Sequence, residues 1–475
     1  MKILHLSWLA FFLSFLVWFN HAPLMASIRT TFSLSDAQVS AILVLNVALT
    51  IPARVVIGAV VDRFGPRVTY SALLAISGVL CLFFACAQDF ATLALARFLL
   101  GFVGAGFVVG IRMIGEWFPA RQMGTAQGIY GGFGNFGSAA AALTMPWLLT
   151  LIGGPDGWRW SIAVTGLLAI AYAVVYYLSV SDTPKGATYF KPKRAAAMEV
   201  SSRGDFVLLV LMQLPMYVAL GLMTWQLGPA KLKLLGEGTV LLIFAGLAGL
   251  FLYQVFLSWR VNAKVFTEIV PEFERFRFAQ VAVLCLMYMV TFGGELAVVS
   301  MLPLFFKDTF GLTLAGAGLV AGVFGGTNFF ARPMGGWLGD KIGRRPVLIM
   351  VLVGVAVGYL AMSTMSAGSS LMLAIAATVG CSMFVNAANG AVYGVIPIIK
   401  RRLTGQIAGL AGAFGNVGGV VYLTLLSSSS PQIFFLAIGG SALVVLGGIL
   451  LFFREPKGTI AELMPDGSLK LIEVA

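Results

Sequence analysis

The chain has 475 residues, of which 59% are hydrophobic and only 11% are charged. A soluble protein of this length would carry roughly 25% charged residues, so the composition excludes a water-soluble globular domain and indicates lipid as the surrounding solvent. The net charge of +12 does not indicate nucleic-acid binding, because the basic residues stand in short loops between apolar runs.

The apolar runs are mostly about 20 residues long, the length that crosses a bilayer as a helix. The first run is too long for a signal peptide and no clean cleavage site follows it, so we interpret it as the first span. We predict about fourteen spans, at 4–25, 39–61, 69–88, 92–117, 123–151, 159–180, 206–227, 238–259, 279–305, 315–338, 346–366, 371–398, 405–427 and 432–453.

Basic residues are distributed unevenly between alternate loops. Loops expected on one side include DRFGPR at 62–67 and DKIGRRP at 340–346, whereas a loop expected on the other side reads SAGSS at 366–370. Lys and Arg accumulate in cytoplasmic loops of membrane proteins. The pattern therefore predicts a multi-pass protein of the cell inner (plasma) membrane with both termini in the cytoplasm.

Two motifs occur twice, in the same order. PARVVIGAVVDRFGPR at 52–67 corresponds to FARPMGGWLGDKIGRR at 330–345, at an offset of 278 residues. GGFGNFGS at 131–138 corresponds to GAFGNVGG at 412–419, at an offset of 281 residues. Both copies of each motif fall in helices of the same predicted orientation, so the chain is a parallel duplication, as in transporters whose halves rock about a central site.

The repeat divides the chain into four parts. We predict an all-α polytopic membrane protein with two parallel six-helix halves, at 1–181 and 279–458, and a cytoplasmic tail at 459–475. The central insert at 182–278 contains two further apolar runs, which would return the chain to the cytoplasm. Alternatively, one or both of these runs lie flat on the membrane or form a packed insert.

Two arginines stand inside predicted spans. Arg54 and Arg332 each precede the acid of the repeated loop by eight residues, or roughly 12 Å along a helix. A charge at the bilayer centre costs at least about 2.5–3.5 kcal/mol, so it usually faces a cavity and has a function. The repeat brings the two guanidiniums face to face, where a planar oxyanion would match their forked donors. The alternative is that each arginine pairs with a neighbouring carboxylate, although few intramembrane acids are available.

The two Gly-Asn runs predict close helix packing around a polar centre. Gly124, Gly128 and Gly132 recur every four residues, and such faces let two helices approach closely. Packing does not explain Asn135 and Asn416, because an amide in lipid must find hydrogen-bond partners. Each asparagine either contacts a bound anion or bonds exposed backbone.

The repeated loops at 58–67 and 336–345 resemble the loop signature of the major facilitator superfamily. The motif acid lies at a helix end, where it can pair with basic groups across the cytoplasmic interface, and the glycine after it permits a tight reversal. A plain topogenic loop is the alternative. The residues expected to gate the inward face are Asp62, Arg63, Asp340 and Arg344.

A more specific resemblance is to the nitrate/nitrite porter family of that superfamily. GGFGNFGS and GAFGNVGG are similar to its duplicated nitrate signature, and PARVV and FARPM to its paired substrate-clamping arginines. YMVTF at 288–292 resembles its aromatic pair. The resemblance covers both six-helix halves, although the insert departs from a twelve-helix plan, and it implies an anion held by the arginines within a narrow glycine-lined path. The expected substrate-binding residues are Arg54, Arg332, Asn135, Asn416, Tyr288, Phe292, Phe107, Gly134 and Gly415.

Glu295 is an acid inside the ninth predicted span, one turn beyond Phe292. The surrounding FGxEL pattern resembles the proton-coupled branch of the porter family. A buried carboxyl group can gain and lose a proton near neutral pH, so Glu295 is a candidate for coupling proton entry to anion entry. Alternatively, it only neutralises one of the two arginines or Arg112.

These features predict a secondary active transporter, not an enzyme, that imports nitrate or nitrite for nitrate assimilation, by proton symport. Proton drive is reasonable because each anion entering against an inside-negative potential costs about 2.3 kcal/mol per 100 mV. Nitrate/nitrite exchange and carriage of another small anion are alternatives. No cofactor or metal is expected, because the four cysteines lack metal-ligand spacing and the two histidines do not suggest a haem or quinone subunit. The expected partners are the anion, protons and the lipid bilayer, without nucleic acid, and the protein is expected to be a monomer.

Overall fold

The computed structural model describes residues 1–192, 197–268, 270–271, 275–455, 458–463 and 469–473. Within them, 13 helices are long and apolar enough to cross a membrane. The predicted all-α polytopic class is therefore confirmed for the membrane part of the chain. Outside the bundle, β1 (Thr459–Leu463) and β2 (Leu469–Glu473) form an antiparallel hairpin in which Thr459 is opposite Glu473.

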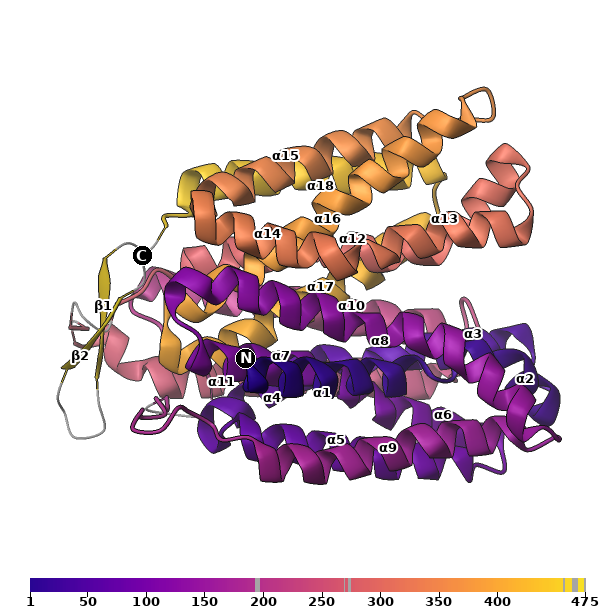
Figure 1. Cartoon of the computed structure of the whole chain (residues 1–475), viewed down its shortest axis with the longest axis horizontal. Helices are drawn as coiled ribbons and strands as arrows, with labels where there is room; N and C mark the ends of the chain where they lie inside the picture. Colours follow the sequence, from indigo (N-terminus) through magenta and orange to yellow (C-terminus); the bar gives the residue numbers. More distant parts are fainter. Residues whose placement is uncertain (193–196, 269, 272–274, 456–457, 464–468, 474–475) are drawn as a thin grey trace.

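The N-terminal half is a helical bundle that occupies the lower part of the view in Figure 1. Its helices are α1 (Lys2–Phe19), α2 (Met25–Phe32), α3 (Asp36–Ala48), α4 (Thr50–Phe64), α5 (Pro66–Ala85), α6 (Phe90–Leu100), α7 (Gly106–Trp117), α8 (Met123–Ile152) and α9 (Gly157–Ser179). A short 3-10 helix, Gly101–Ala105, joins α6 to α7.

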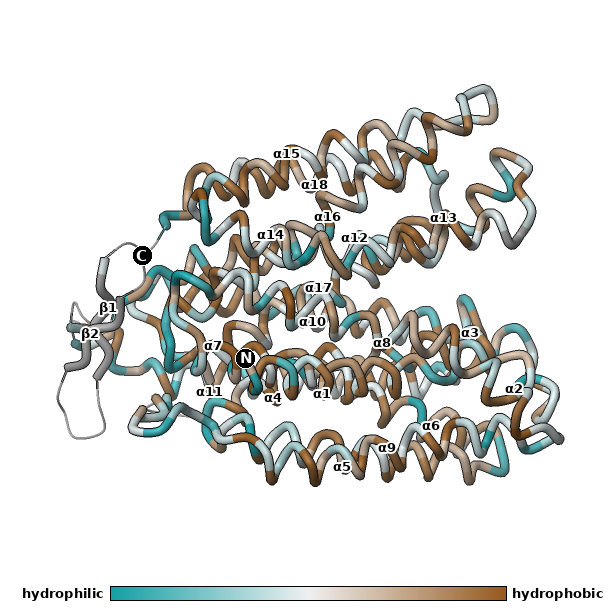
Figure 2. The backbone as a smooth tube through the Cα atoms, in the orientation of Figure 1, coloured by the Kyte–Doolittle hydropathy of each residue, from teal (hydrophilic) through white to brown (hydrophobic). Residues whose placement is uncertain are grey.

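The C-terminal half is a second bundle in the upper part of the same view (Figure 1). Its helices are α12 (Phe278–Phe310), α13 (Leu314–Gly326), α14 (Asn328–Ile342), α15 (Arg344–Ser363), α16 (Leu371–Ile399), α17 (Thr404–Leu426) and α18 (Pro431–Phe452). Hydrophobic residues run along both bundles, and hydrophilic residues gather at their two ends (Figure 2).

The central insert forms α10 (Arg203–Leu227) and α11 (Glu237–Asn262), and both qualify as candidate spans. The amide of Gln226 in α10 donates to the Thr424 hydroxyl in α17 at 3.1 Å. α11 packs on α10, where Gln213 donates to Ser258 at 3.2 Å. The most apolar stretch of α11 has no buried residue, so its other face is left for lipid.

Two of the predicted spans are interrupted at equivalent positions of the repeat. The span predicted at 39–61 is divided between α3 and α4 at Leu49, and the span at 315–338 is divided between α13 and α14 at Thr327. Each interruption stands five residues before an intramembrane arginine, Arg54 or Arg332. Leu49 (φ −74°, ψ −22°) and Thr327 (φ −59°, ψ −18°) keep right-handed helical backbone angles, so each interruption is a local distortion of a helix close to its arginine.

The two halves meet through α4 with α17 and through α8 with α14. Glycines allow these helices to touch: a Cβ atom added to Gly128 would lie 2.6 Å from the Arg332 carbonyl oxygen. At the ends of α4 and α14, Gly65 and Gly343 adopt φ of +88° and +97°, a region that glycine enters without the strain that a Cβ imposes. The tight reversal predicted after each motif acid is therefore present.

Candidate functional site

Arg54 lies in α4 and its side chain is fully buried. Its Nε donates to the carbonyl oxygen of Gly104 at 3.2 Å, and its Nη1 donates to that of Gly412 at 2.5 Å. Gly104 belongs to the same half, whereas Gly412 lies in α17 of the other half. The guanidinium therefore bridges the two bundles, and within the described residues its Nη2 has no partner.

Arg332 occupies the equivalent position in α14 and is also buried. Its Nη1 donates to the carbonyl oxygen of Gly131 at 3.4 Å, and its Nη2 donates to the Tyr288 hydroxyl at 3.4 Å. Gly131 corresponds to Gly412 in the repeat, so each arginine bonds the same carbonyl of the opposite half. The Nε of Arg332 has no partner in the described part of the chain.

Both guanidiniums face one aromatic ring. The Cζ atoms of Arg54 and Arg332 lie 5.5 and 5.7 Å from the centroid of Phe292. Across the residues that the structure describes, neither arginine forms a salt bridge. A cation–π contact contributes about 0.5–2 kcal/mol, less than the several kcal/mol lost when an ion leaves water. Among the described residues the site therefore has two buried guanidiniums without a direct ion pair, and the Glu295 carboxyl interacts with Arg332 only at longer range.

Aromatic side chains surround the arginines. The rings of Tyr288 and Phe292 stack with centroids 4.9 Å apart. Phe107 lies parallel to Tyr288 at 6.5 Å, and the Cζ of Arg332 lies 5.9 Å from the Phe107 ring. Tyr393 meets Phe107 and Tyr288 edge-on at 4.5 and 4.8 Å. The structure thus brings together the three predicted aromatic residues and adds Tyr393.

The two signature asparagines have different surroundings. With its Oδ1 turned toward Arg332, Asn135 accepts a hydrogen bond from Nη2 at 3.3 Å and another from Nη1. Asn416 is fully buried, and neither polar atom of its amide has a partner among the described residues. Asn135 is therefore part of the arginine cluster, and Asn416 is a buried amide without a protein partner.

The glycines that precede these asparagines also differ. A Cβ atom on Gly415 would lie 2.7 Å from a ring carbon of Phe292 and 2.8 Å from one of Tyr288. Gly415 therefore allows α17 to approach the aromatic pair. A Cβ atom on Gly134 would instead meet the ring of Phe11, so Gly134 allows close packing of α8 on α1.

Glu295 in α12 is held by two amides. The Nδ2 atoms of Asn328 and Asn389 both donate to its carboxylate, the second at 2.8 Å. Thr291 in turn donates to the Oδ1 of Asn389 at 2.7 Å. The described residues give Glu295 no salt bridge to an arginine, and Arg112 instead pairs with Asp62 at 3.2 Å.

A cavity of about 640 Å³ reaches this site from one end of the molecule. Asn135, Phe292 and Glu295 line its inner part, whereas Leu143 in α8 and Pro303 in α12 line it farther out. It extends away from the repeated loops, and neither Arg54 nor Arg332 lines it. Phe292 and Asn135, which both contact the arginine cluster, are therefore the residues at which the cavity borders it.

The opposite end, where the repeated loops lie, is closed by two symmetry-related contacts. Asp62 accepts hydrogen bonds from the backbone N–H groups of Gly405 and Gln406 at 2.9 and 2.8 Å. Asp340 accepts them from Gly124 and Thr125 at 2.9 and 2.7 Å. Each carboxylate caps the first turn of a helix in the other half, where the helix dipole favours negative charge.

The basic residues near Asp62 and Asp340 differ between the two halves. Arg344 lies 3.8 Å from Asp340 and also donates to the Ala120 carbonyl oxygen. Arg63, in contrast, is exposed and stacks on Phe64, with its Cζ 5.3 Å from the ring centroid. In the described structure Arg112 in α7 is the basic residue that pairs with Asp62, at 3.2 Å.

The repeated motifs did not predict four residues of the site and of the closed end of the molecule. They are Asn328, Asn389, Tyr393 and Arg112. Asn328 contacts Glu295, and Arg112 contacts Asp62, although each pair is distant in the sequence. The sequence feature that could have identified the three polar residues is their position inside apolar spans. A buried amide or guanidinium there costs free energy and is retained only with a partner or a function. Tyr393 gave no signal, because an aromatic residue in an apolar run is ordinary core.

The fold and site are those of a membrane transport protein rather than an enzyme: two matching helical bundles, closed at one end, around a buried polar centre. The family model described as Major Facilitator Superfamily matches residues 7–268 and 284–467. A solved structure of the human organic anion transporter MFSD10 shares the fold, with a TM-score of 0.64 and 11% identity, over 94% of this chain and 99% of that one.

Two curated relatives define the family more closely. The chain is 45% identical to "Nitrate/nitrite transporter NrtP" of Picosynechococcus sp. (strain ATCC 27264 / PCC 7002 / PR-6), over 97% of this chain and 94% of that protein. It is 28% identical to "Probable nitrate/nitrite antiporter NarK1" of Thermus thermophilus, over 88% of this chain and 83% of that protein. The chain belongs to the major facilitator superfamily and, within it, to the nitrate/nitrite porter family.

Proposed function

We propose that this protein carries nitrate, nitrite or both, with the anion between Arg54 and Arg332. The observation that carries the proposal is the absence, among the described residues, of any carboxylate paired with either buried guanidinium. The name of the NrtP relative supports the choice of anion. A bound anion would supply the missing counter-charge.

The donor inventory favours a small monovalent anion. Backbone carbonyls already accept from three of the arginine N–H groups, and Arg54 Nη2 and Arg332 Nε are left without partners. A flat anion can use these donors while its faces contact the surrounding aromatic rings. A divalent tetrahedral anion such as sulfate would need more donors to offset its greater desolvation cost.

Binding measured on the purified protein tests this assignment. Calorimetric titrations with nitrate, nitrite, chloride and sulfate should show nitrate or nitrite binding at least tenfold tighter than chloride, and no measurable sulfate binding. Equal affinity for chloride, or tight sulfate binding, would contradict the proposal and favour another anion on the same fold.

We propose proton symport as the mechanism of import, with Glu295 as the proton carrier. Glu295 lines the cavity and is separated from the arginine cluster by little more than Phe292, one helical turn away. Two amides hold its carboxylate, and no described arginine forms a salt bridge with it. Proton entry through the cavity can therefore change the charge beside the anion site.

Replacing Glu295 by glutamine removes the group that exchanges a proton and preserves its size. We expect Glu295→Gln to bind nitrate with near-normal affinity but to lose gradient-driven accumulation. The measurement is nitrate uptake into proteoliposomes with and without an inside-alkaline pH gradient. The exposed Glu237→Gln, in the first turn of α11, is the matched control and should respond to the gradient like the unmodified protein.

If Glu295→Gln still accumulated nitrate in response to the pH gradient, Glu295 would not be the proton carrier. Exchange of nitrate for nitrite is the second candidate, because the Thermus relative is named as an antiporter. Exchange predicts uptake that requires nitrite inside the vesicles and does not change when the pH gradient is imposed.

We infer a topology from the distribution of basic loops. The end closed by Asp62 and Asp340 would face the cytoplasm, together with both termini, in an inner-membrane protein that acts as a monomer. In this proposal, 1–181 and 279–458 rock as two units, with 182–278 as an insert between them. The contacts of Asp62, Asp340 and Arg344 would open when the anion is released inward.

A further inference from the structure

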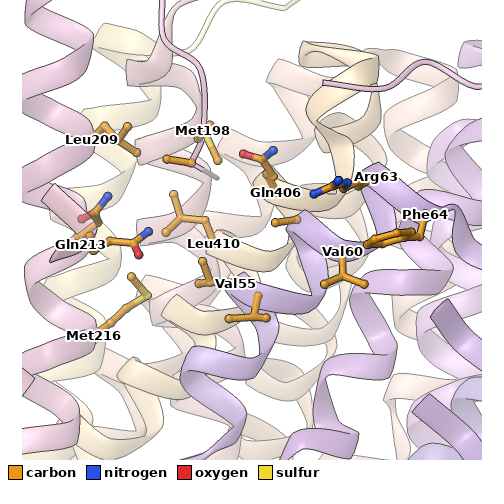
Figure 3. A pocket seen from close by; sticks show the side chains of 14 residues that line it. Val55, Val60, Arg63, Phe64, Met198, Leu209, Gln213, Met216, Gln406 and Leu410 are labelled. Carbon is orange, nitrogen blue, oxygen red and sulfur yellow. The ribbon is translucent and has the colours of Figure 1, made fainter. Parts of the chain in front are cut away.

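A second pocket, of about 320 Å³, lies beside the inward end of the bundle. It is formed by α4 of the N-terminal half, α17 of the C-terminal half and helices α10 and α11 of the insert. No residue that lines it lines the cavity that reaches Glu295. It is therefore separate from the anion site, and the insert completes one of its walls (Figure 3).

One end of the pocket carries Arg63 and Gln406, and two more amides, Gln213 and Gln254, line it from the helices of the insert. Arg63 of α4 and Gln406 of α17 lie close together there (Figure 3), and in the described structure Arg63 forms no salt bridge. Gln406 is 4% exposed, yet its Nε2 has no hydrogen-bond partner among the described residues. Gln213 of α10 is equally buried, and its Oε1 has no partner either.

The other lining residues are apolar, and the pocket opens at the lipid-facing side of the bundle. Val55 and Met216 lie at the end away from Arg63, with Leu410 between α4 and α10 (Figure 3). Val56 and Phe64 on its rim are 58% and 57% exposed, although both belong to a candidate membrane span. An occupant can therefore enter sideways from the bilayer.

We propose that this pocket binds a membrane phospholipid with an anionic, hydroxyl-bearing headgroup. The phosphate oxygens accept from the Arg63 guanidinium and from the Gln406 amide, and a headgroup hydroxyl donates to Gln213 Oε1. The acyl chains cover Val55, Val56 and Met216. Lipid fits better than a soluble ligand because the open wall is apolar and lies on membrane-spanning helices.

The bound lipid would hold the inward end closed. Arg63 follows Asp62 in α4, and the backbone N–H of Gln406 in α17 is one of the donors to Asp62. A headgroup that contacts both Arg63 and Gln406 therefore bridges the same two helices as the Asp62 contact. When the halves separate at this end, the pocket divides and the headgroup loses one of its partners.

Native mass spectrometry of the full-length protein tests the site, with phosphatidylglycerol as the probe and phosphatidylcholine as its zwitterionic comparison. We expect Arg63→Ala and Gln406→Leu each to lower phosphatidylglycerol occupancy at least fivefold, and Met216→Trp to lower it by filling the apolar wall. Lys341→Ala is the matched control, because Lys341 follows Asp340 as Arg63 follows Asp62 but does not line the pocket.

If Arg63→Ala and Lys341→Ala lowered phosphatidylglycerol occupancy equally, the result would show only a general attraction of anionic lipid to basic residues, and would contradict the proposed site. Competition by glycerol phosphate as effective as that by phosphatidylglycerol would show a soluble ligand instead, and would overturn the lipid assignment. Hydrogen exchange at 404–410 provides a second measurement in nanodiscs. Phosphatidylglycerol should slow it several-fold in the unmodified protein and in Lys341→Ala, but not in Gln406→Leu. Unchanged exchange in the unmodified protein would overturn the closing role. None of these results depends on which anion is carried.

Discussion

Arg54→Lys is expected to abolish nitrate binding and transport while leaving the protein folded. Arg54 uses Nε and Nη1 on carbonyl oxygens of two different helices, and its Nη2, which has no partner among the described residues, is the group proposed to bind the anion. A lysine ammonium is a single point charge and cannot serve these three directions at once. Losing the two hydrogen bonds that the N–H groups of Nη2 would donate to the anion, at about 1.5–3 kcal/mol each, should weaken nitrate affinity at least about 100-fold. Titration calorimetry and uptake into proteoliposomes measure this effect.

Arg97→Lys is the control for Arg54→Lys. It distinguishes the effect of losing an anion contact from the effect of replacing any buried arginine. Arg97 is equally buried, but it donates to the Trp18 carbonyl oxygen at 2.6 Å and to Asn46, all within the N-terminal half. Its replacement should lower the Tm and preserve the further rise in Tm that saturating nitrate produces. Near-normal nitrate affinity in Arg54→Lys would refute the paired-arginine site.

Gly128→Leu is expected to stop transport by keeping the two halves apart. A Cβ atom at this position would lie 2.6 Å from the Arg332 carbonyl oxygen and 2.7 Å from the Pro333 Cα. Both atoms are backbone of α14, so the conflict cannot be relieved without moving that helix away from α8. Overpacking costs about 1–3 kcal/mol or more, which reduces the closed population about 5- to 150-fold. Initial uptake rates should fall accordingly.

The matched control is Gly246→Leu in α11, where a Cβ atom would meet nothing within 4 Å. It introduces the same side chain into a helix of the insert and should transport at the normal rate. Hydrogen exchange at residues 404–410 should increase in Gly128→Leu and stay unchanged in the control. If Gly128→Leu transported normally, the end closed by Asp62 and Asp340 would not need to close as tightly as the structure shows.

The architecture was predictable because lipid imposes strong rules on sequence. Helix length, the basic loops and the two copies of the arginine motif predicted the halves and placed Arg54 and Arg332 opposite each other. The repeat also identified the acids at the closed end, because Asp62 and Asp340 end equivalent helices. In each case the signal was local in sequence or copied at a fixed offset.

Other features depend on contacts between distant segments and could not be predicted in this way. Nothing in the spacing indicates that Asn328 and Asn389 hold Glu295, because the two amides come from helices that meet only in the folded bundle. The motif suggested Arg63 as a gating residue and did not indicate which basic group pairs with Asp62. The structure turns Arg63 outward, and Arg112, which is distant in sequence, pairs with Asp62.

The crossed bonds from each arginine to the opposite half have an evolutionary consequence. Arg54 bonds the carbonyl of Gly412, and Arg332 bonds that of Gly131. In the proposed mechanism, the groups that bind the anion are the same groups that join the bundles, and each turnover would break and remake these bonds. Variants selected to bind the anion more tightly when it is scarce should therefore complete the transport cycle more slowly. High affinity and a high transport rate are thus expected to trade off against each other in this fold.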